Sequence, residues 1–363
     1  MLSFITLLFD ALISRVREFP FNLEFAVTYK CNLKCIQCDI WCYNEKNLLE
    51  LSVEEIYKIF SSYRNFKVLG ITGGEPFLRN DLQQIIETII QTQNGLKILF
   101  ITTNGQLPEK TEAIIKNILK RYKNLRVITL VSIDGPMEIH EKIRGVSKAY
   151  EKALTTISLL ANLKQRFNNF SLGTVTVCSP FNIDSFTKVI EEIKNLKDKF
   201  NLEPSFCIWF QGQLYKNLNS LYHYEIDKFR RELIKFIPNI KSVVHEGGIV
   251  SKGRNVFYDL LKLWLNKPGS QIVPCEAAKI RFFLDPYGNV YPCTIFNFII
   301  GNLKDYDFDF KKLFKNDMRN KARELIKSEK CPICCNTCET IPSIMAHPLY
   351  ALLNWIKSKR KKD

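Results

Sequence analysis

The chain of 363 residues lacks an apolar segment long enough to cross a bilayer. A spanning helix needs about 20 apolar residues, and Asp10 interrupts the apolar N-terminus. A signal peptide is not indicated either, because Arg15 and Arg17 follow the apolar stretch and no small-residue cleavage site is visible. The body of the chain has no Arg/Lys run with interleaved aromatic residues, so its net charge of +15 predicts no nucleic-acid partner. Internal repeats and low-complexity stretches are also missing.

Cysteine, in contrast, is abundant, with twelve residues in the chain. Eight of them form two tight groups at positions 31–42 and 331–338, and Cys275 and Cys293 are two more spaced positions. Disulfide-rich secreted scaffolds are usually much shorter. Clustered cysteines in a long chain indicate metal ligands instead. We therefore expect metal centres in a reducing cytoplasm.

Short β-rich runs alternate with helical patterns along residues 21–212, which predicts parallel strands joined by crossover helices. The expected strands are 23–29, 67–73, 97–103, 127–133, 170–177 and 204–210. The expected helices include 53–63, 81–93, 109–122, 147–163 and 184–199. We divide the chain into an amphipathic helix (1–20), a strand–helix domain (21–212), a helical connection (213–270), a second cysteine-bearing unit (271–340) and an apolar helix with a basic tail (341–363).

Cys31, Cys35 and Cys38 have the spacing C-x3-C-x2-C, which places three thiolates in one short loop. A [4Fe–4S] cluster takes four ligands, so three cysteines leave one iron open to a small molecule. A structural zinc site normally closes with four protein ligands. The spacing therefore favours an iron–sulfur cluster that holds a small molecule.

Further motifs follow later strands, where parallel barrels place their chemistry. They are Gly73-Gly74-Glu75-Pro76, then Thr103-Asn104-Gly105, then Ser132-Ile133-Asp134-Gly135 with His140 and Arg144-Gly145. Taken alone, the first is also a strand-to-helix turn with an early proline, and an Asn-Gly turn explains the second.

Together with the segment 28–38, these motifs resemble the radical S-adenosylmethionine (SAM) superfamily, whose fold is an open (β/α)6 barrel. The resemblance implies that SAM chelates the open iron and is cleaved to methionine and a 5′-deoxyadenosyl radical. It implies that Gly73, Gly74, Glu75 and Pro76 contact the SAM amino group and that Asn104 lies at the edge of the pocket. Ser132 and Arg144 would bind the SAM carboxylate and ribose region, Asp134 would be a turn or ribose ligand, and His140 would be structural.

The second cysteine set begins with Cys275, then Gly288 and Cys293, and ends with C-x2-C-C-x2-C at positions 331–338. A β-hairpin turning at 286–289 would present Cys293. The set resembles SPASM and twitch domains, which bind auxiliary iron–sulfur clusters, but it has fewer cysteines than a full SPASM domain. The resemblance implies one auxiliary [4Fe–4S] cluster on Cys275, Cys293, Cys331 and Cys334, with Cys338 as a substitute ligand. Zinc stays an alternative for four thiolates.

Cys178 follows the fifth expected strand, and Cys207 lies in the sixth. Either thiol could donate a hydrogen atom to a substrate radical, and Cys178 is our candidate catalytic residue. The alternative is that a free cysteine is a small buried hydrophobe.

Both ends of the chain are amphipathic. Polar residues of 1–17 fall on one narrow stripe, so this helix needs an apolar partner: a membrane interface, the open barrel or a second copy. Residues 344–356 are apolar, with Tyr350 and Trp355 near a basic tail that includes Lys357 and Lys359. Such a tail is usually a solvated end, but next to aromatic residues it also suits an anionic membrane surface.

The expected function is radical SAM chemistry at an unactivated C–H bond of a membrane lipid or isoprenoid chain, with a ferredoxin or flavodoxin as reductant. The expected location is the cytoplasm, at the inner face of the membrane. The rivals are a maturase of ribosomally made peptides, a small-molecule dehydrogenase or cofactor-biosynthesis enzyme, and a non-catalytic iron–sulfur scaffold.

Overall fold

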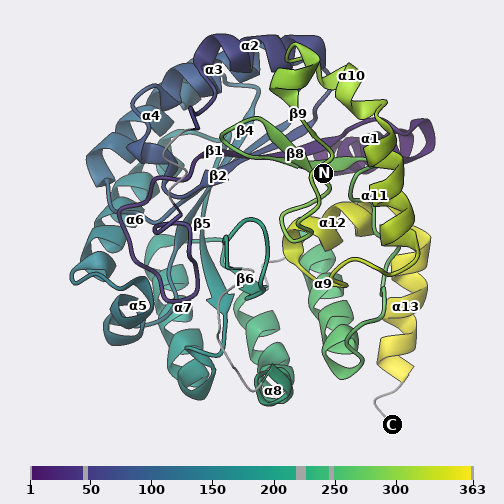
Figure 1. The fold of residues 1–363 in the computed structure, drawn as a ribbon. Coiled ribbons are helices and arrows are strands. Elements are labelled where there is room, and N and C mark those ends of the chain that lie inside the picture. Colours follow the sequence, from purple (N-terminus) through teal and green to yellow (C-terminus); the bar gives the residue numbers. More distant parts are fainter. Residues whose placement is uncertain (1, 44–47, 218–225, 245–248, 361–363) are drawn as a thin grey trace.

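Six parallel strands curve into an open barrel in the computed structural model, which describes residues 2–43, 48–217, 226–244 and 249–360 (Figure 1). The strands are β1 (Asn22–Thr28), β2 (Val68–Gly73), β3 (Ile98–Thr103), β4 (Arg126–Ser132), β5 (Phe170–Cys178) and β6 (Ser205–Ile208). They pair in chain order from β1 to β6. All six expected strands are therefore confirmed, with bounds shifted by one or two residues.

Helices follow the strands and cover the outside of the sheet (Figure 1). They are α2 (Val53–Ser62), α3 (Leu82–Thr92), α4 (Pro108–Arg121), α5 (Met137–Arg144), α6 (Ala149–Arg166) and α7 (Phe186–Phe200), with 3-10 turns η1 (Pro76–Leu78) and η2 (Ile183–Ser185). Local signals define their ends: Ser52 and Glu55 form a capping box at the start of α2. The expected open α/β barrel is confirmed.

Alternate residues of the barrel strands have different surroundings. Leu99 and Ile101 of β3, like Val127 and Val131 of β4, are fully buried in the main core. Their neighbours Phe100, Ile128 and Leu130 are only half-buried. Because successive side chains point to opposite faces of a strand, the first group packs under the helices and the second lines the inside of the barrel.

The second unit continues the same sheet. β7 (Arg281–Leu284) pairs parallel with β1, and β8 (Asn289–Tyr291) and β9 (Gly301–Asn302) follow antiparallel. Asp285 shapes the β7–β8 turn, since its Oδ1 accepts hydrogen bonds from the backbone N–H of Tyr287 and of Asn289, both at 2.9 Å. The expected hairpin is confirmed, and its fusion to the barrel sheet is an addition that the sequence did not indicate.

The remaining elements are mostly helical: α8 (Ile226–Val244), α9 (Ile249–Asn266), η3 (Leu303–Tyr306), α10 (Phe310–Phe314), α11 (Asp317–Lys327), α12 (Thr337–Ala346) and α13 (Pro348–Arg360). The apolar helix expected in 341–363 corresponds to α13, and it is separated from α12 by an interruption at His347. Pro348 has no backbone N–H and disfavours helical geometry in the residue before it. Lys361 and Lys362 of the basic tail lie outside the described residues. In the described part of the chain, no helix is both long and apolar enough to span a membrane.

The N-terminal helix α1 (Leu2–Arg17) covers the end of the barrel where the strands begin. Its Leu7 and Ala11 are buried against Phe21, Val68 and Ile280, and Asp10 forms an ion pair with Lys97. Of the three alternative partners considered for this amphipathic helix, the structure therefore shows the barrel.

Candidate functional site

The loop after β1 carries Cys31, Cys35 and Cys38, and its backbone is held on both sides. On one side, Gly74 N–H donates to Thr28 O and Glu75 N–H donates to Lys30 O, both at 2.8 Å. On the other side, Lys34 N–H donates to Arg144 O at 3.1 Å and Ile36 N–H donates to Ile143 O at 2.9 Å. The ends of β2 and α5 thus fix the loop that presents the three thiols.

Three glycines make this close contact sterically feasible. A Cβ on Gly73 would lie 2.1 Å from Thr28 O, and one on Gly74 would lie 2.2 Å from Lys30 O. Gly145 ends α5 with a φ of +68°, and its Cβ would lie 2.3 Å from Lys34 O. We expected the glycines of 73–74 to admit a ligand. In the structure, they admit the backbone of the cysteine loop.

Glu75 joins the ends of β2 and β3. Its fully buried carboxylate accepts hydrogen bonds from Thr103 Oγ1 (2.9 Å), Asn104 N (2.7 Å) and Phe77 N (3.1 Å). Burial raises the pKa of Glu75 to about 7, although these hydrogen bonds act in the opposite direction. Pro76 follows directly and starts the 3-10 turn η1.

Asn104 reaches from the end of β3 to the cysteine loop. Its Nδ2 donates to Asn32 Oδ1 at 2.8 Å and lies 3.8 Å from Cys31 Sγ. Its Oδ1 accepts a hydrogen bond from the backbone N–H of Gln106 at 3.0 Å. The predicted Asn-Gly turn therefore also provides a polar contact to a candidate ligand.

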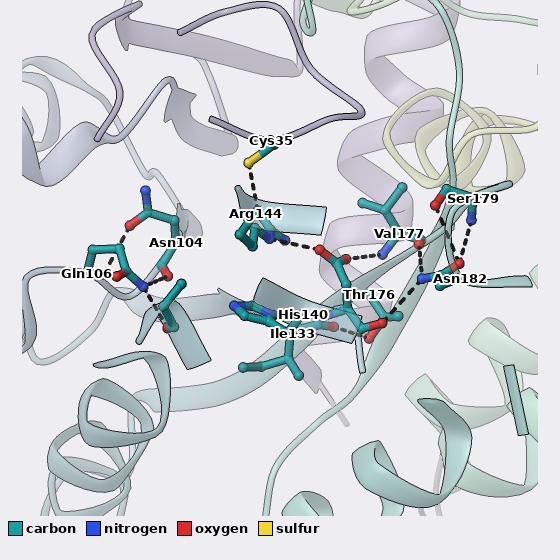
Figure 2. Close-up of polar contacts among 12 residues, drawn as sticks. Cys35, Asn104, Gln106, Ile133, His140, Arg144, Thr176, Val177, Ser179 and Asn182 are labelled. Carbon is teal, nitrogen blue, oxygen red and sulfur yellow. Dashed lines mark hydrogen bonds and ion pairs between the residues drawn. The ribbon is translucent and has the colours of Figure 1, made fainter. Parts of the chain in front are cut away.

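Arg144 connects the motif after β4 with the cysteine loop (Figure 2). Its Nε lies 2.8 Å from Asp134 Oδ2, and its Nη1 lies 3.9 Å from Cys35 Sγ. Asp134 is fully buried, and its Oδ1 accepts a hydrogen bond from Val177 N at 3.2 Å. The pair thus aligns the ends of β4 and β5 beside Cys35.

His140 is fully buried on α5, and its Nδ1 accepts a hydrogen bond from Asp134 N at 3.2 Å (Figure 2). Burial, and then the charge of Arg144, lower the pKa of His140 well below its usual range. A neutral ring that accepts from the backbone fits the structural role expected for it. Ser132 ends β4 opposite Val175 and is buried, and its role toward SAM stays a prediction.

The donor set of the loop fits an iron–sulfur cluster, because it offers three thiols, no closing fourth ligand, and a cationic guanidinium next to one of them. Burial, and then the nearby Cys35, raise the pKa of the Cys38 thiol well above its usual range. Within the residues described, no three Cys, His, Asp or Glu side chains are already grouped to hold a metal ion. Ligation would therefore turn the thiols toward one another.

The second cysteine set surrounds one cavity. Cys275, Cys293, Cys331 and Cys334, our four expected ligands, all line it, and so does the buried Cys335. Cys338 is not among the lining residues. The groups that act on it electrostatically are Glu24, Arg281, Glu339 and Cys207. The cavity thus matches the four expected ligands, whereas the substitute ligand lies beside a charged network.

That network is buried, and the sequence reasoning missed it. Arg281 Nε lies 3.3 Å from Glu339 Oε1, and Arg281 Nη2 lies 3.7 Å from Glu24 Oε2. The same Glu339 oxygen accepts hydrogen bonds from Thr294 N at 3.2 Å and Thr294 Oγ1 at 2.8 Å, directly after Cys293. The sequence did offer a signal: each of the apolar runs 22–28 and 281–284 contains one charged residue, Glu24 and Arg281. Buried charges are normally paired, so the two could have been expected to lie together.

Cys178 and Cys207 are on opposite faces of the sheet. Cys178 pairs with Ile208 and is buried in the main core, whereas Cys207 pairs with Val177 and is partly exposed. The role of Cys178 as a hydrogen-atom donor stays a prediction, and its buried position does not favour it. That position corresponds instead to the buried-hydrophobe alternative, because the alternation of β5 directs Cys178 under the helices.

Residues 209–217, which we call the linking segment, connect the two cysteine sites. Trp209 Nε1 donates to Gln37 O at 3.0 Å, and Asp39 N–H donates to Tyr215 O at 2.9 Å, on either side of Cys38. At its other edge, Leu214 N–H donates to Thr294 O at 2.8 Å, next to Cys293. No motif marked this segment, because its contacts are mostly made through the backbone.

Comparison with known proteins identifies the family to which this chain belongs. Residues 25–193 match the Radical SAM superfamily, and residues 275–339 match the SPASM iron–sulfur cluster-binding domain. A probable GTP 3′,8-cyclase of Methanococcus maripaludis strain S2 is 35% identical over 241 residues, which cover 62% of this chain and 73% of the relative. The chain belongs to the radical SAM superfamily. It is an enzyme family whose cofactors are SAM and [4Fe–4S] clusters, and the SPASM match assigns an iron–sulfur cluster to the second cysteine set as well.

Other similarities are more partial. A probable GTP 3′,8-cyclase of M. maripaludis strain C5 is 36% identical over 147 residues, covering 38% of this radical SAM enzyme and 48% of the relative. The chain thus spans about half the length of the first curated relatives it matches. Among solved structures, native anSMEcpe with bound AdoMet has a TM-score of 0.61 at 19% identity, covering 94% of this chain and all of that one. SuiB of Streptococcus suis has a TM-score of 0.58 at 15% identity, covering 88% and 72%. At such identities these structures show the shared fold alone.

Proposed function

We propose that this radical SAM enzyme abstracts hydrogen from an unactivated C–H bond of a membrane lipid or isoprenoid chain. The observation that carries the proposal is the inner face of the barrel. There, the half-buried Phe100 of β3 and Ile128 of β4 are register partners. Leu130 of β4 and Val175 of β5, also half-buried, lie further along the same face, where Leu130 pairs with Thr102 and Val175 pairs with Ser132. Such a lining suits a hydrocarbon chain, because apolar surface is favourably removed from water.

The remaining roles follow from the site. Cys31, Cys35 and Cys38 would hold the cluster that binds SAM, and the segment 73–76, Asn104, Ser132, Asp134 and Arg144 would shape the SAM pocket. When bound and reduced by a ferredoxin- or flavodoxin-type donor, the cluster would supply the electron that splits SAM into methionine and the 5′-deoxyadenosyl radical. Glu75 and the Asp134–Arg144 pair would keep the pocket in place, since they join neighbouring strand ends.

A second candidate is a small-molecule reaction of cofactor biosynthesis. It is favoured by the relative named as a probable GTP 3′,8-cyclase, of which this chain covers 73% at 35% identity. The four apolar side chains of the inner face favour the lipid instead, because they offer a polar nucleotide no hydrogen-bond partner.

The source of the abstracted hydrogen separates the two candidates. Anaerobically reconstituted protein would receive dithionite, SAM and a detergent-dispersed lipid with perdeuterated chains, and 5′-deoxyadenosine would be analysed by mass spectrometry. We expect deuterium in the product, and none with a Cys35→Ala control. Stimulation by GTP without deuterium from lipid would support the second candidate. A wild-type protein that never cleaves SAM would favour a non-catalytic scaffold.

A further inference from the structure

Helix α1 exposes an apolar stripe on the side away from the barrel. Ile5, Phe9, Ile13 and Val16 follow one another at steps of three or four residues, and Phe9 and Val16 are 60% and 79% exposed. The opposite face is fixed, with Leu7 and Ala11 buried against the barrel end. The stripe is therefore held outward by a helix that cannot turn to bury it.

Helix α13 likewise has one exposed apolar face and one face packed against the protein. Its apolar stripe is exposed and consists of Leu349, Tyr350, Leu352, Leu353 and Ile356. Its other face is held against the protein, since Ala351 is buried, Asn354 Nδ2 donates to Ile272 O at 2.7 Å and Trp355 Nε1 donates to Asp259 Oδ2 at 2.8 Å.

The two helices meet at one corner of the molecule. Arg15 Nη1, near the end of α1, donates to Ala346 O at 3.2 Å. Ala346 ends α12, and α13 begins two residues later at Pro348. The end of the α1 stripe therefore lies near the start of the α13 stripe, although the two segments are more than 300 residues apart in the chain.

The charge along the two helices selects the partner. The only acidic residue of α1 is Asp10, which pairs with Lys97, and α13 has none. Basic residues follow each stripe. Arg17 ends α1, next to Arg15, whose Nε lies 3.9 Å from Glu276 Oε1, and Lys357, Lys359 and Arg360 end α13. A second copy of this chain, which carries +15, would oppose like charges. An anionic membrane surface satisfies both the apolar and the basic groups.

We propose that the exposed faces of α1 and α13 together dock on an anionic membrane surface. Such docking would bring the enzyme to a lipid substrate, and this link to the substrate rests on the proposed function. A single weak signal gives only marginal membrane binding, so stable docking needs two anchoring elements, which α1 and α13 would provide.

Vesicle flotation of the full-length protein tests this surface without turnover. The vesicles contain either phosphatidylcholine alone or phosphatidylcholine mixed with phosphatidylglycerol. We expect flotation with the anionic vesicles only, and less of it at high salt. The double variants Phe9→Ser/Val16→Ser and Leu349→Ser/Leu353→Ser should each reduce the bound fraction about tenfold or more. A control, Tyr57→Ser/Met137→Ser, removes exposed apolar side chains from α2 and α5 and should leave flotation unchanged.

Three results would overturn the proposal: no flotation, equal flotation of the stripe variants and the control, or a dimer in light scattering that the stripe variants dissociate. Circular dichroism melts would establish that each variant is folded. Because the deuterium-transfer assay uses dispersed lipid, failure to dock and failure to react give different outcomes.

Discussion

Among single residues, Glu75 has an environment that makes stability depend on pH. Its pKa is raised from 4.5 to about 7 because the carboxyl group is buried. Below pH 4.5 the group is protonated in the folded and the unfolded chain, so it favours neither state. As the pH rises above 4.5, Glu75 loses its proton in the unfolded chain before it does so in the folded chain. The free energy of unfolding therefore falls until the pH has passed the pKa of Glu75 in the folded chain, about 7.

A Glu75→Gln variant lacks this titration. The difference in melting temperature between the variant and the wild type, both without SAM, should therefore shift in favour of the variant as the pH is raised from about 5 to about 8. The corresponding change in the free energy of unfolding is at most ~3 kcal/mol. The melts would be recorded by anaerobic fluorimetry at several pH values. Parallel pH profiles for the two proteins would show that Glu75 titrates normally.

Cys178 gives a second prediction at this scale. Because its side chain is packed in the main core, Cys178→Ala should lower the free energy of unfolding by about 1 kcal/mol. Iron content and SAM cleavage should stay at wild-type levels. Urea denaturation and 5′-deoxyadenosine formation would be measured side by side. Loss of substrate turnover with intact SAM cleavage would restore the hydrogen-donor role.

At the scale of elements, the contact between the end of α5 and the cysteine loop depends on Gly145. Gly145→Ala adds a Cβ 2.3 Å from Lys34 O at a φ of +68°, so the loop must shift. We expect a loss of about four irons per chain together with lower stability. Gly269→Ala is a matched control, since Gly269 also has a positive φ (+83°) but nothing within 4 Å of a Cβ. It should lose about 1–2 kcal/mol and keep its iron, as measured by metal analysis and thermal melts.

The elements also show how far the sequence could predict this structure. The strands β1 to β5 were readily predicted, because each is six residues or longer and bounded by turn residues. The SAM-site motifs were found because they end these strands. The linking segment and the fusion of β7 to β1 were not predicted, because backbone hydrogen bonds such as Leu214 N–H to Thr294 O leave no pattern in side chains. The face that Cys178 takes was not predicted, because adjacency to a strand end in the sequence does not determine it.

For the whole molecule, the two cysteine sites belong to one continuous structure. A shared sheet joins them through β1 and β7, and the linking segment contacts the loop of Cys38 and the residue after Cys293. Buried charges at Arg281 and Glu339 lie next to the second centre, where they would influence its potential.

Iron content tests this two-centre arrangement and its ligands. Anaerobically purified wild type should contain about eight irons and no zinc, and a Cys31/Cys35/Cys38→Ala variant about four. Cys334→Ala should also retain about four, since Cys334 lines the cavity of the second site. Cys338→Ala should retain about eight, because Cys338 is absent from that cavity and faces Glu24 and Arg281 instead. About four irons plus one zinc in wild type would make the second site structural, and an iron loss in Cys338→Ala would make Cys338 a ligand after all.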